Sequence, residues 1–138
     1  MSAVREVMSK DLVTVERSAT VEEASAVMWG GHAGSALVME GDRLIGIFTE
    51  RDIMKALSRH ADMGRTATVR ECMTFDPVTI DADATVGEAL DRMLTGGFRH
   101  LPVTEGGRLV GIVSMTDVAQ ATARAGAEPS AGAEPRTE

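Results

Sequence analysis

The amino-acid sequence predicts an α/β fold made of two β-α-β-β-α repeats that pack on each other as a pseudo-two-fold pair. The first observation behind this prediction is an internal repeat. Residues 4–59 realign on residues 69–124 without a gap, and more than two in five aligned positions are identical. The second is that helix-start and hairpin patterns recur in the same order in both copies. Because one copy is too small to bury its apolar face alone, we expect the two to share their packing.

Each copy opens with a short amphipathic segment and then a β-rich stretch. The opening segments are residues 4–8 and 69–73, and the β-rich stretches are residues 12–15 and 77–80. The stretches are rich in Val, Ile and Thr, which favour strands. Each copy is therefore expected to begin with one strand that leads toward a helix.

The first helix of each copy carries its own start signal. Thr20 with Glu23 fits a capping box, in which the Thr hydroxyl accepts from a backbone amide and the Glu side chain reaches back. Thr85 with Glu88 repeats the pattern. Apolar residues then follow at helical spacing on one face. Glycine pairs are expected to end the two helices, at residues 30–31 and 96–97.

A hairpin and a second helix complete each copy. Glycine-containing turns join the expected strands, which are residues 35–39 with 44–49 and residues 100–104 with 109–114. The second helices are expected over residues 52–59 and 117–124. We therefore divide the chain into a first repeat with its linker (1–67), a second repeat (68–124) and a tail (125–138). The tail repeats Ala-Gly-Ala-Glu-Pro and is predicted to be disordered, because it has nothing to bury.

Composition excludes several classes of function. The chain of 138 residues has 14 Lys and Arg against 21 Asp and Glu, a net charge of -7. Nucleic-acid binding needs clustered cations, so we expect no nucleic-acid partner. Without a long apolar run or an apolar leader, we expect no membrane partner and a cytoplasmic location. With 3% aromatic residues, packing is expected to rest on aliphatic side chains and nine Met.

The sequence predicts neither a metal site nor a catalytic residue. Cys72 is the only cysteine, which rules out an internal disulfide and favours a buried, inert thiol. His32, His60 and His100 lack metal-ligand spacing relative to one another and to Cys72.

A hydroxyl and a carboxylate stand three residues apart at matched positions, where a strand leads into a helix. The pairs are Thr49 with Asp52 and Ser114 with Asp117. One interpretation is a plain helix start. The other is a ligand site, because capping boxes prefer Glu or Gln where both copies use Asp. We expect the shorter Asp to reach its own N-cap amide less well. It would then be free to accept hydrogen bonds from vicinal hydroxyls, while the helix N-terminus serves a phosphate.

The doubled unit and its motifs resemble the cystathionine β-synthase (CBS) domain family. The resemblance rests on the order of elements, on Leu101-Pro102-Val103, on residues 111–117, and on Val-Met-Ser and Cys-Met-Thr in the opening segments. It covers roughly residues 4–124. The family implies a regulatory module with two clefts for adenine nucleotides or related adenosyl ligands. It also implies dimers formed through the helices.

The resemblance carries site residues over position by position. Asp52 and Asp117 match the ribose-binding acid, and Thr49 and Ser114 match a hydroxyl that contacts ribose or phosphate. In the family a cleft takes its acid from one copy and its adenine-holding residues from the other. The remaining implied ligand-binding residues are therefore Val13 and Ala33 to Ser35 for Asp117, and Val78, Phe98, Arg99 and His100 for Asp52.

The two copies differ where basic residues face the phosphates. Arg99 and His100 match such positions, whereas the first copy has Gly34 and Ser35, and Leu37 replaces the expected Pro. We therefore expect one cleft to bind clearly better, or only one to bind at all.

Two features on the helices have alternative explanations. Arg51, Lys55 and Arg59 are about four residues apart, which favours a solvated face over phosphate contact by Arg51. Trp29 is either a core residue or an anchor in a helix-mediated homodimer.

The function predicted from the sequence is a non-enzymatic sensor module. It would bind AMP, ATP or S-adenosylmethionine as a regulatory ligand, need no cofactor, and signal to an unidentified partner protein. One alternative is a ligand-free interaction or dimerisation scaffold. The other is a nucleotide hydrolase that uses Asp52 or Asp117, although neither segment brings a second carboxylate or a His at fixed spacing.

Overall fold

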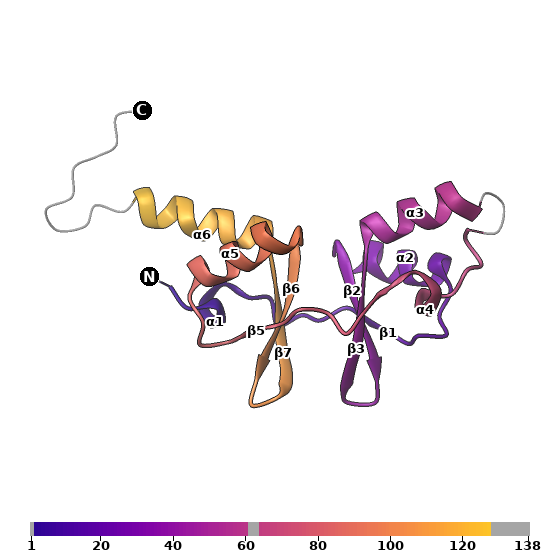
Figure 1. Cartoon of the computed structure of the whole chain (residues 1–138), viewed down its shortest axis with the longest axis horizontal. Helices are drawn as coiled ribbons and strands as arrows, with labels where there is room; N and C mark the ends of the chain where they lie inside the picture. The colour runs from indigo at the N-terminus through magenta and orange to yellow at the C-terminus, as the bar shows by residue number, and fades with distance from the viewer. Residues whose placement is uncertain (1, 61–63, 128–138) are drawn as a thin grey trace, which may run out of the picture.

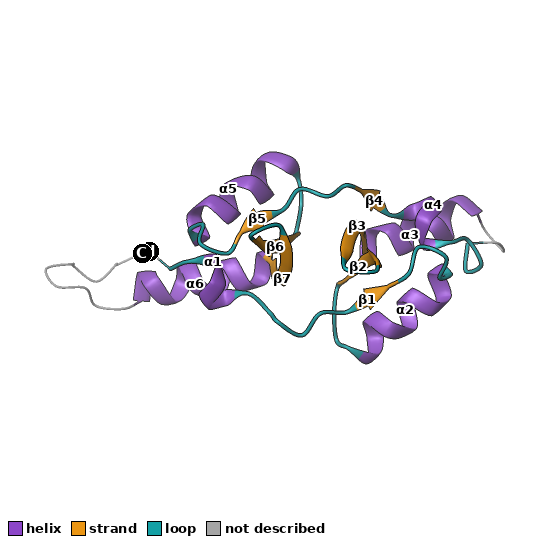
Figure 2. Ribbon diagram, turned by 90° about the horizontal axis from the view of Figure 1, so that it is seen from below, coloured by secondary structure: helices purple, strands orange, loops and turns teal. Residues whose placement is uncertain are grey.

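The computed structural model of the chain describes residues 2–60 and 64–127 (Figure 1). Two small sheets lie side by side at the centre, and helices cover the outer side of each (Figures 1 and 2). The first repeat contributes β1 (Thr14–Val15), α2 (Val21–Gly30), β2 (Ser35–Glu40), β3 (Arg43–Thr49) and α3 (Glu50–His60). The second contributes β5 (Ile80–Asp81), α5 (Val86–Gly96), β6 (His100–Glu105), β7 (Arg108–Ser114) and α6 (Met115–Ala127). The opening segments form α1 (Val4–Val7), α4 (Val69–Cys72) and β4 (Thr74–Phe75).

Both sheets are built in the same way. The first has the strand order β1-β2-β3-β4 and the second β5-β6-β7. In each, a short strand runs parallel to the first hairpin strand, and the hairpin itself is antiparallel. Even the irregularities repeat, because the register shifts between Val38 and Met39 and again between Val103 and Thr104. The α/β fold of two β-α-β-β-α repeats predicted from the sequence is confirmed.

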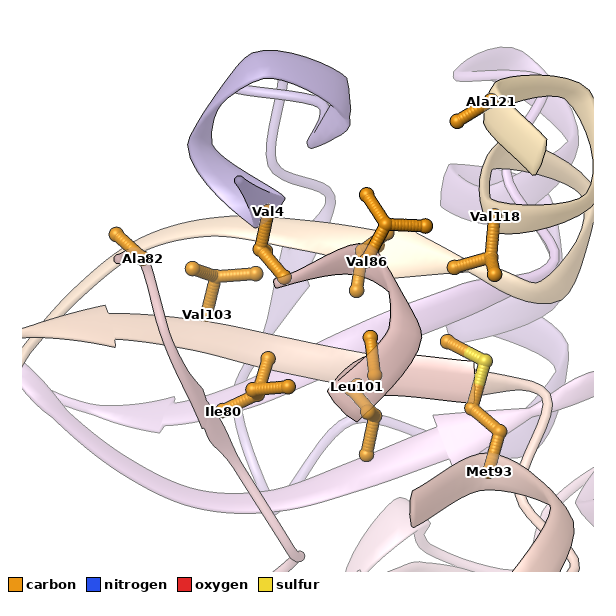
Figure 3. Close-up of a cluster of buried hydrophobic side chains, with 11 residues drawn as sticks. Val4, Ile80, Ala82, Val86, Met93, Leu101, Val103, Val118 and Ala121 are labelled. Atoms are coloured by element: carbon orange, nitrogen blue, oxygen red, sulfur yellow. The ribbon is translucent and has the colours of Figure 1, made fainter. Parts of the chain in front are cut away.

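The opening segment of each repeat crosses to the other repeat. The amide of Val4 donates to Ala84 in the second repeat, and that of Val69 donates to Ala19 in the first, each at 2.8 Å. Val4 is fully buried in the core of the second repeat, as Figure 3 shows, and Val69 is buried in that of the first. Each core therefore includes a segment from the other sequence repeat. The domain boundaries predicted after residues 67 and 124 stay predictions.

Two glycines let the opening segments cross close to the hairpins. β4 pairs with β3 beside Gly46, and Ser9 pairs with Ile112 beside Gly111. A Cβ added to Gly111 would lie 2.6 Å from Sδ of Met8 and 2.9 Å from the carbonyl oxygen of Ser9. At Gly46 the matching distances, to Sδ of Met73 and to the carbonyl oxygen of Thr74, would be 2.5 Å and 2.9 Å. No side chain fits at either position without a shift of backbone, which explains the glycines.

The helix signals predict the observed helices with small differences. Thr20 and Glu23 form the complete capping box, and Thr85 accepts from the amide of Glu88 at 3.1 Å. Both second helices begin two residues earlier than expected, at Glu50 and Met115. Helix α6 continues to Ala127, three residues into the expected tail, and residues 128–138 lie outside the described part of the chain. The linker expected at residues 60–67 begins within α3, and its residues 61–63 are not described.

Candidate ligand-binding clefts

Asp52 lies in the first turn of α3 and is held there by the strand that precedes it. Its Oδ2 accepts hydrogen bonds from the amide of Thr49 at 2.9 Å and from the Thr49 hydroxyl at 3.2 Å. The residue is 8% exposed. A carboxylate in the first turn is favoured by the helix dipole, so local structure alone stabilises it in this position.

Asp117 repeats this arrangement at the start of α6. Its Oδ2 accepts from the amide of Ser114 at 2.9 Å, and its own amide donates to Ser114 Oγ at 3.1 Å. The expectation that Asp reaches its N-cap amide less well than Glu is wrong. Glu23 Oε1 makes the corresponding bond to the amide of Thr20 at the same 2.9 Å. The shorter side chain therefore reaches its N-cap amide as well as the longer one does.

One oxygen of each aspartate remains available. Within the described residues, Oδ1 of Asp52 and Oδ1 of Asp117 accept no hydrogen bond from the protein. No fully buried side-chain oxygen or nitrogen of this part of the chain lacks a partner. Each Oδ1 is therefore accessible to solvent or to a ligand. A carboxylate fixed by one oxygen and open at the other can accept hydrogen bonds without first losing side-chain freedom.

A cleft of about 360 Å³ opens beside Asp52. We call it the Asp52 cleft. It is lined by Gly34, Ile47, Thr49, Glu50, Arg51, Asp52, Lys55, Thr74, Pro77, Val78, Gly96, Gly97, Phe98, Arg99 and His100. Its carboxylate comes from the first repeat, and most of the facing wall comes from the second. The volume lies within the range of about 300–1,000 Å³ that small-molecule sites occupy.

A second cleft, of about 290 Å³, opens beside Asp117. We call it the Asp117 cleft. It is lined by Ser9, Asp11, Val13, Gly31, His32, Ala33, Gly34, Ser35, Leu37, His100, Ile112, Ser114 and Asp117. Here the carboxylate comes from the second repeat and most of the facing wall from the first. The two clefts are thus related by the repeat symmetry, with the roles of the repeats exchanged.

The structure brings together every residue that the resemblance implied. Residues at the Asp52 cleft are Thr49, Asp52, Val78, Phe98, Arg99 and His100, and residues at the Asp117 cleft are Val13, Ala33, Ser114 and Asp117. The pairing of an acid from one repeat with a wall from the other agrees with the sequence expectation. The roles of these residues in ligand binding stay predictions.

His100 belongs to both clefts. It lines each of them together with Gly34, so its imidazole stands in the wall that the two clefts share. Burial lowers the pKa of His100 below its ordinary value. The carboxylates of Glu50 and Asp117 oppose this shift, and Arg99 adds to it. The neutral imidazole, which can both donate and accept a hydrogen bond, is the favoured form.

Several lining residues were not anticipated from the sequence. Lys55 was assigned to a solvated face, yet it is both exposed and at the Asp52 cleft, with Arg51 one turn before it. The sequence did contain a signal for the position of Lys55 at this cleft, because Lys55 follows Asp52 by three residues and residues at this spacing share a helix face. Asp11 gave no local signal. It reaches the Asp117 cleft because the opening segment crosses to the second repeat.

Cys72 and Trp29 lie outside both clefts. Cys72 is half-buried rather than fully buried, and burial raises the pKa of its thiol, which disfavours the reactive thiolate. No group of three or more His, Cys, Asp or Glu able to hold a metal ion occurs among residues 2–60 and 64–127. Trp29 is 85% exposed, so the core alternative for it is wrong.

These features define a tandem α/β repeat module with two related clefts where its halves meet. The CBS domain matches the chain twice, at residues 4–59 and at residues 69–124. The chain belongs to the CBS domain family. It is 40% identical over 121 residues to an uncharacterised 17.7 kDa protein of Acidianus ambivalens, covering 86% of this chain and 71% of that protein. The chain spans 40% and 61% of the next two curated relatives.

Solved structures of the family match the whole paired unit. The CBS-domain protein ATU1752 of Agrobacterium tumefaciens has a TM-score of 0.84 at 32% identity, covering 88% of this chain and 99% of that one. The CBS domain pair of protein MJ0100, solved in complex with 5'-methylthioadenosine and S-adenosyl-L-methionine, has a TM-score of 0.82 at 25% identity, covering 91% and 98%. Pairs of CBS domains are regulatory, ligand-binding modules, and no catalytic family is indicated for the chain. Among the described residues no helix is long and apolar enough to span a membrane.

Proposed function

We propose that this protein is a non-enzymatic sensor that binds an adenosyl ligand between its two CBS domains and passes on its occupancy to a partner. The observation that carries the proposal is the orientation of the Asp52 and Asp117 carboxylates. Each carboxylate is oriented by a capping bond, keeps one oxygen available, and faces a cleft whose opposite wall belongs to the other repeat. Ribose hydroxyls are ligands that such an oxygen can accept from.

The mechanism we infer is a shift between two arrangements of the repeats. A ligand held by an aspartate of one repeat and by strand residues of the other bridges both. It favours the arrangement in which both contacts are made, by an amount equal to its difference in affinity for the two arrangements. β3 and β7 are in contact at the centre, so a change in the relative position of the repeats would alter this contact.

We also propose that two copies of the chain form a homodimer through their outer helices. Large apolar side chains are exposed on the outer helices: Val27, Trp29, Met54, Leu57 and Leu94. Trp29 and Leu94 occupy matched positions of the two repeats, on α2 and α5, and are 85% and 67% exposed. Apolar side chains of this size gain free energy when a second subunit covers them. A dimer would place both clefts of each chain within one regulatory assembly.

Calorimetric titration of AMP, ATP and S-adenosylmethionine into the wild type, Asp52→Ala and Asp117→Ala tests the proposal. We expect saturable binding that falls at least about tenfold in one or both variants, the size expected for lost hydrogen bonds to a charged group. Glu23→Ala is the matched control, because it removes a carboxylate from the same capping position of α2, which lines neither cleft. It should weaken the fold without changing ligand affinity.

The same samples separate the proposal from its two alternatives. A scaffold would give no heat with any of the three compounds, even when the protein is shown to be folded and free of bound nucleotide. A hydrolase would release ADP or adenosine from ATP and magnesium, measured by chromatography, and Asp52→Ala or Asp117→Ala would abolish the release. Either result would replace the sensor proposal.

A further inference from the structure

We infer that the two clefts select adenosyl ligands of different charge. The Asp52 cleft takes a nucleotide that carries phosphate, and the Asp117 cleft takes a nucleoside without phosphate, either neutral or cationic. This inference rests on the proposed function, because it assigns a ligand class to each of the same two clefts.

The Asp52 cleft gathers cations from both of its walls. Arg51 and Lys55 come from α3, and Arg99 precedes β6 in the other repeat. All three are exposed, and within the described residues none forms an ion pair with a carboxylate. Glu50 and Asp52 are the acidic residues of the lining, so cations outnumber carboxylates by three to two. Cations without a partner on two sides of a helix N-terminus favour a bound phosphate.

The Asp117 cleft has the opposite balance. Its lining contains Asp11 and Asp117 but neither Lys nor Arg. Its two histidines are His32 and His100, and burial lowers the pKa of His100, which favours the neutral imidazole. A phosphate here would face two carboxylates without a compensating cation, whereas a neutral thioether or a sulfonium cation would not be repelled.

The difference is encoded at matched positions of the two repeats. Arg51 corresponds to Thr116, Lys55 to Gln120, and Arg99 to Gly34. Each cation of one cleft is thus replaced by a neutral residue in the other copy. Asp11 corresponds to Asp76, but only Asp11 lines a cleft. The three cation exchanges act in the same direction, toward a more cationic Asp52 cleft, and only Glu50, which corresponds to Met115, acts against them.

Packing disfavours a side chain at position 34 of the first copy. A Cβ on Gly34 would meet Oε1 of Glu50 and would lie 3.1 Å from Cε1 of His100. A side chain there would have to displace residues that belong to the wall shared by both clefts. A small residue at position 34 therefore fits the place where the two repeats meet, and it contributes no cation to the Asp117 cleft.

The test compares AMP with adenosine, which differ only by the phosphate, and adds S-adenosylmethionine as the cationic probe. Asp117→Ala leaves the Asp52 cleft intact, and Asp52→Ala leaves the Asp117 cleft intact. By calorimetry we expect Asp117→Ala to bind AMP more tightly than adenosine by about tenfold or more. We expect Asp52→Ala to prefer adenosine or S-adenosylmethionine to AMP. Added salt should weaken AMP binding and leave adenosine binding unchanged.

A charge variant with a matched control identifies the residues responsible. The combined change Arg51→Gln, Lys55→Gln and Arg99→Gln should reduce the AMP-to-adenosine affinity ratio by about tenfold. The control removes the same charge from three exposed arginines that line neither cleft, Arg43→Gln, Arg70→Gln and Arg108→Gln. It should leave the ratio unchanged. Asp11→Asn should raise AMP affinity in the Asp52→Ala background.

Two outcomes overturn the inference, and they differ from failure of the proposed function. An equal AMP-to-adenosine ratio in Asp52→Ala and Asp117→Ala would show that the clefts do not discriminate. An equal ratio in the two triple variants would show that the cleft cations do not select phosphate. If the folded wild type binds none of the three probes, the proposed function itself fails, and the inference with it.

Discussion

Gly34 lies against the imidazole of His100, so closely that a Cβ on Gly34 would be 3.1 Å from Cε1 and 3.3 Å from Nε2 of the ring. The two residues come from different repeats and are not equivalent to each other. Gly34 corresponds to Arg99, and His100 corresponds to Ser35. The contact therefore breaks the repeat symmetry at the wall between the clefts.

Replacement of Gly34 by Ala tests this contact. We expect Gly34→Ala to displace the side chains of His100 and Glu50 and to lower the free energy of unfolding by about 1–2 kcal/mol, as over-packing does. Urea denaturation measures the loss. Gly30→Ala is the control, because nothing lies within 4 Å of its added Cβ at the end of α2. It should be neutral or slightly stabilising. Equal stability of the two variants would show that the contact has no energetic consequence.

Gly111→Ala should loosen the opening segment that crosses to the second repeat. The added Cβ would meet Sδ of Met8 and the carbonyl oxygen of Ser9, and the backbone must move to relieve the second contact. We expect a loss of about 1–3 kcal/mol. Hydrogen exchange should show the loss locally, as faster exchange of the Ser9 amide, which donates to Ile112. Unchanged protection of that amide would count against the close packing.

Val4→Ala should destabilise the protein although Val4 lies near the start of the chain. Its side chain is fully buried in the core of the second repeat. Truncation leaves a cavity and removes about two buried methylene equivalents, at a cost of about 2 kcal/mol. Val78→Ala is the same substitution at a 44% exposed position away from the outer helices, and without ligand it should change stability by less than about 0.5 kcal/mol. Similar urea midpoints for both variants would contradict the crossing of α1.

Stability should fall as the pH drops below the ordinary pKa of histidine, about 6.5. Burial lowers the pKa of His100 in the folded protein, opposed by Glu50 and Asp117 and aided by Arg99. The unfolded chain then binds more protons in this range, so protonation favours unfolding as the pH approaches and passes the lowered pKa. Urea midpoints of the wild type between about pH 7.5 and about pH 5.5 measure the slope. His100→Gln should flatten it, and an unchanged slope would exclude His100 as the source.

Trp29→Ala should weaken the proposed homodimer. The side chain is 85% exposed on α2, and buried aromatic anchors contribute a large share of interface energy. We expect the dimer dissociation constant to rise by at least about tenfold in sedimentation experiments. Phe75→Ala removes another exposed aromatic side chain, 68% exposed on β4 rather than on a helix, and serves as the control. A wild type that sediments as a monomer, or a Trp29→Ala variant with unchanged association, would refute this interface.

Much of the fold could be predicted because its signals are local. Thr20 and Glu23 mark a helix start within one turn, and the glycines at 41 and 106 mark hairpins between two short strands. The internal repeat extended each local assignment from one copy to the other. The same locality produced the incorrect argument about Asp52 and Asp117. The preference for Glu at the capping position is statistical, whereas the hydrogen bond from the Thr49 amide to Asp52 depends on the local backbone geometry.

The amino-acid sequence alone was enough to predict the repeat, the order of its elements, the helix starts and the candidate carboxylates at two matched positions. Only the folded chain reveals that the opening segments exchange repeats and that Asp11 lines a cleft. It also reveals that Gly34 and His100 meet at the shared wall. Periodicity and capping depend on residues within a few positions of each other, and a sequence displays them directly. Contacts between the repeats join residues far apart in the chain, and these arise only when burial of the apolar faces brings the two halves together.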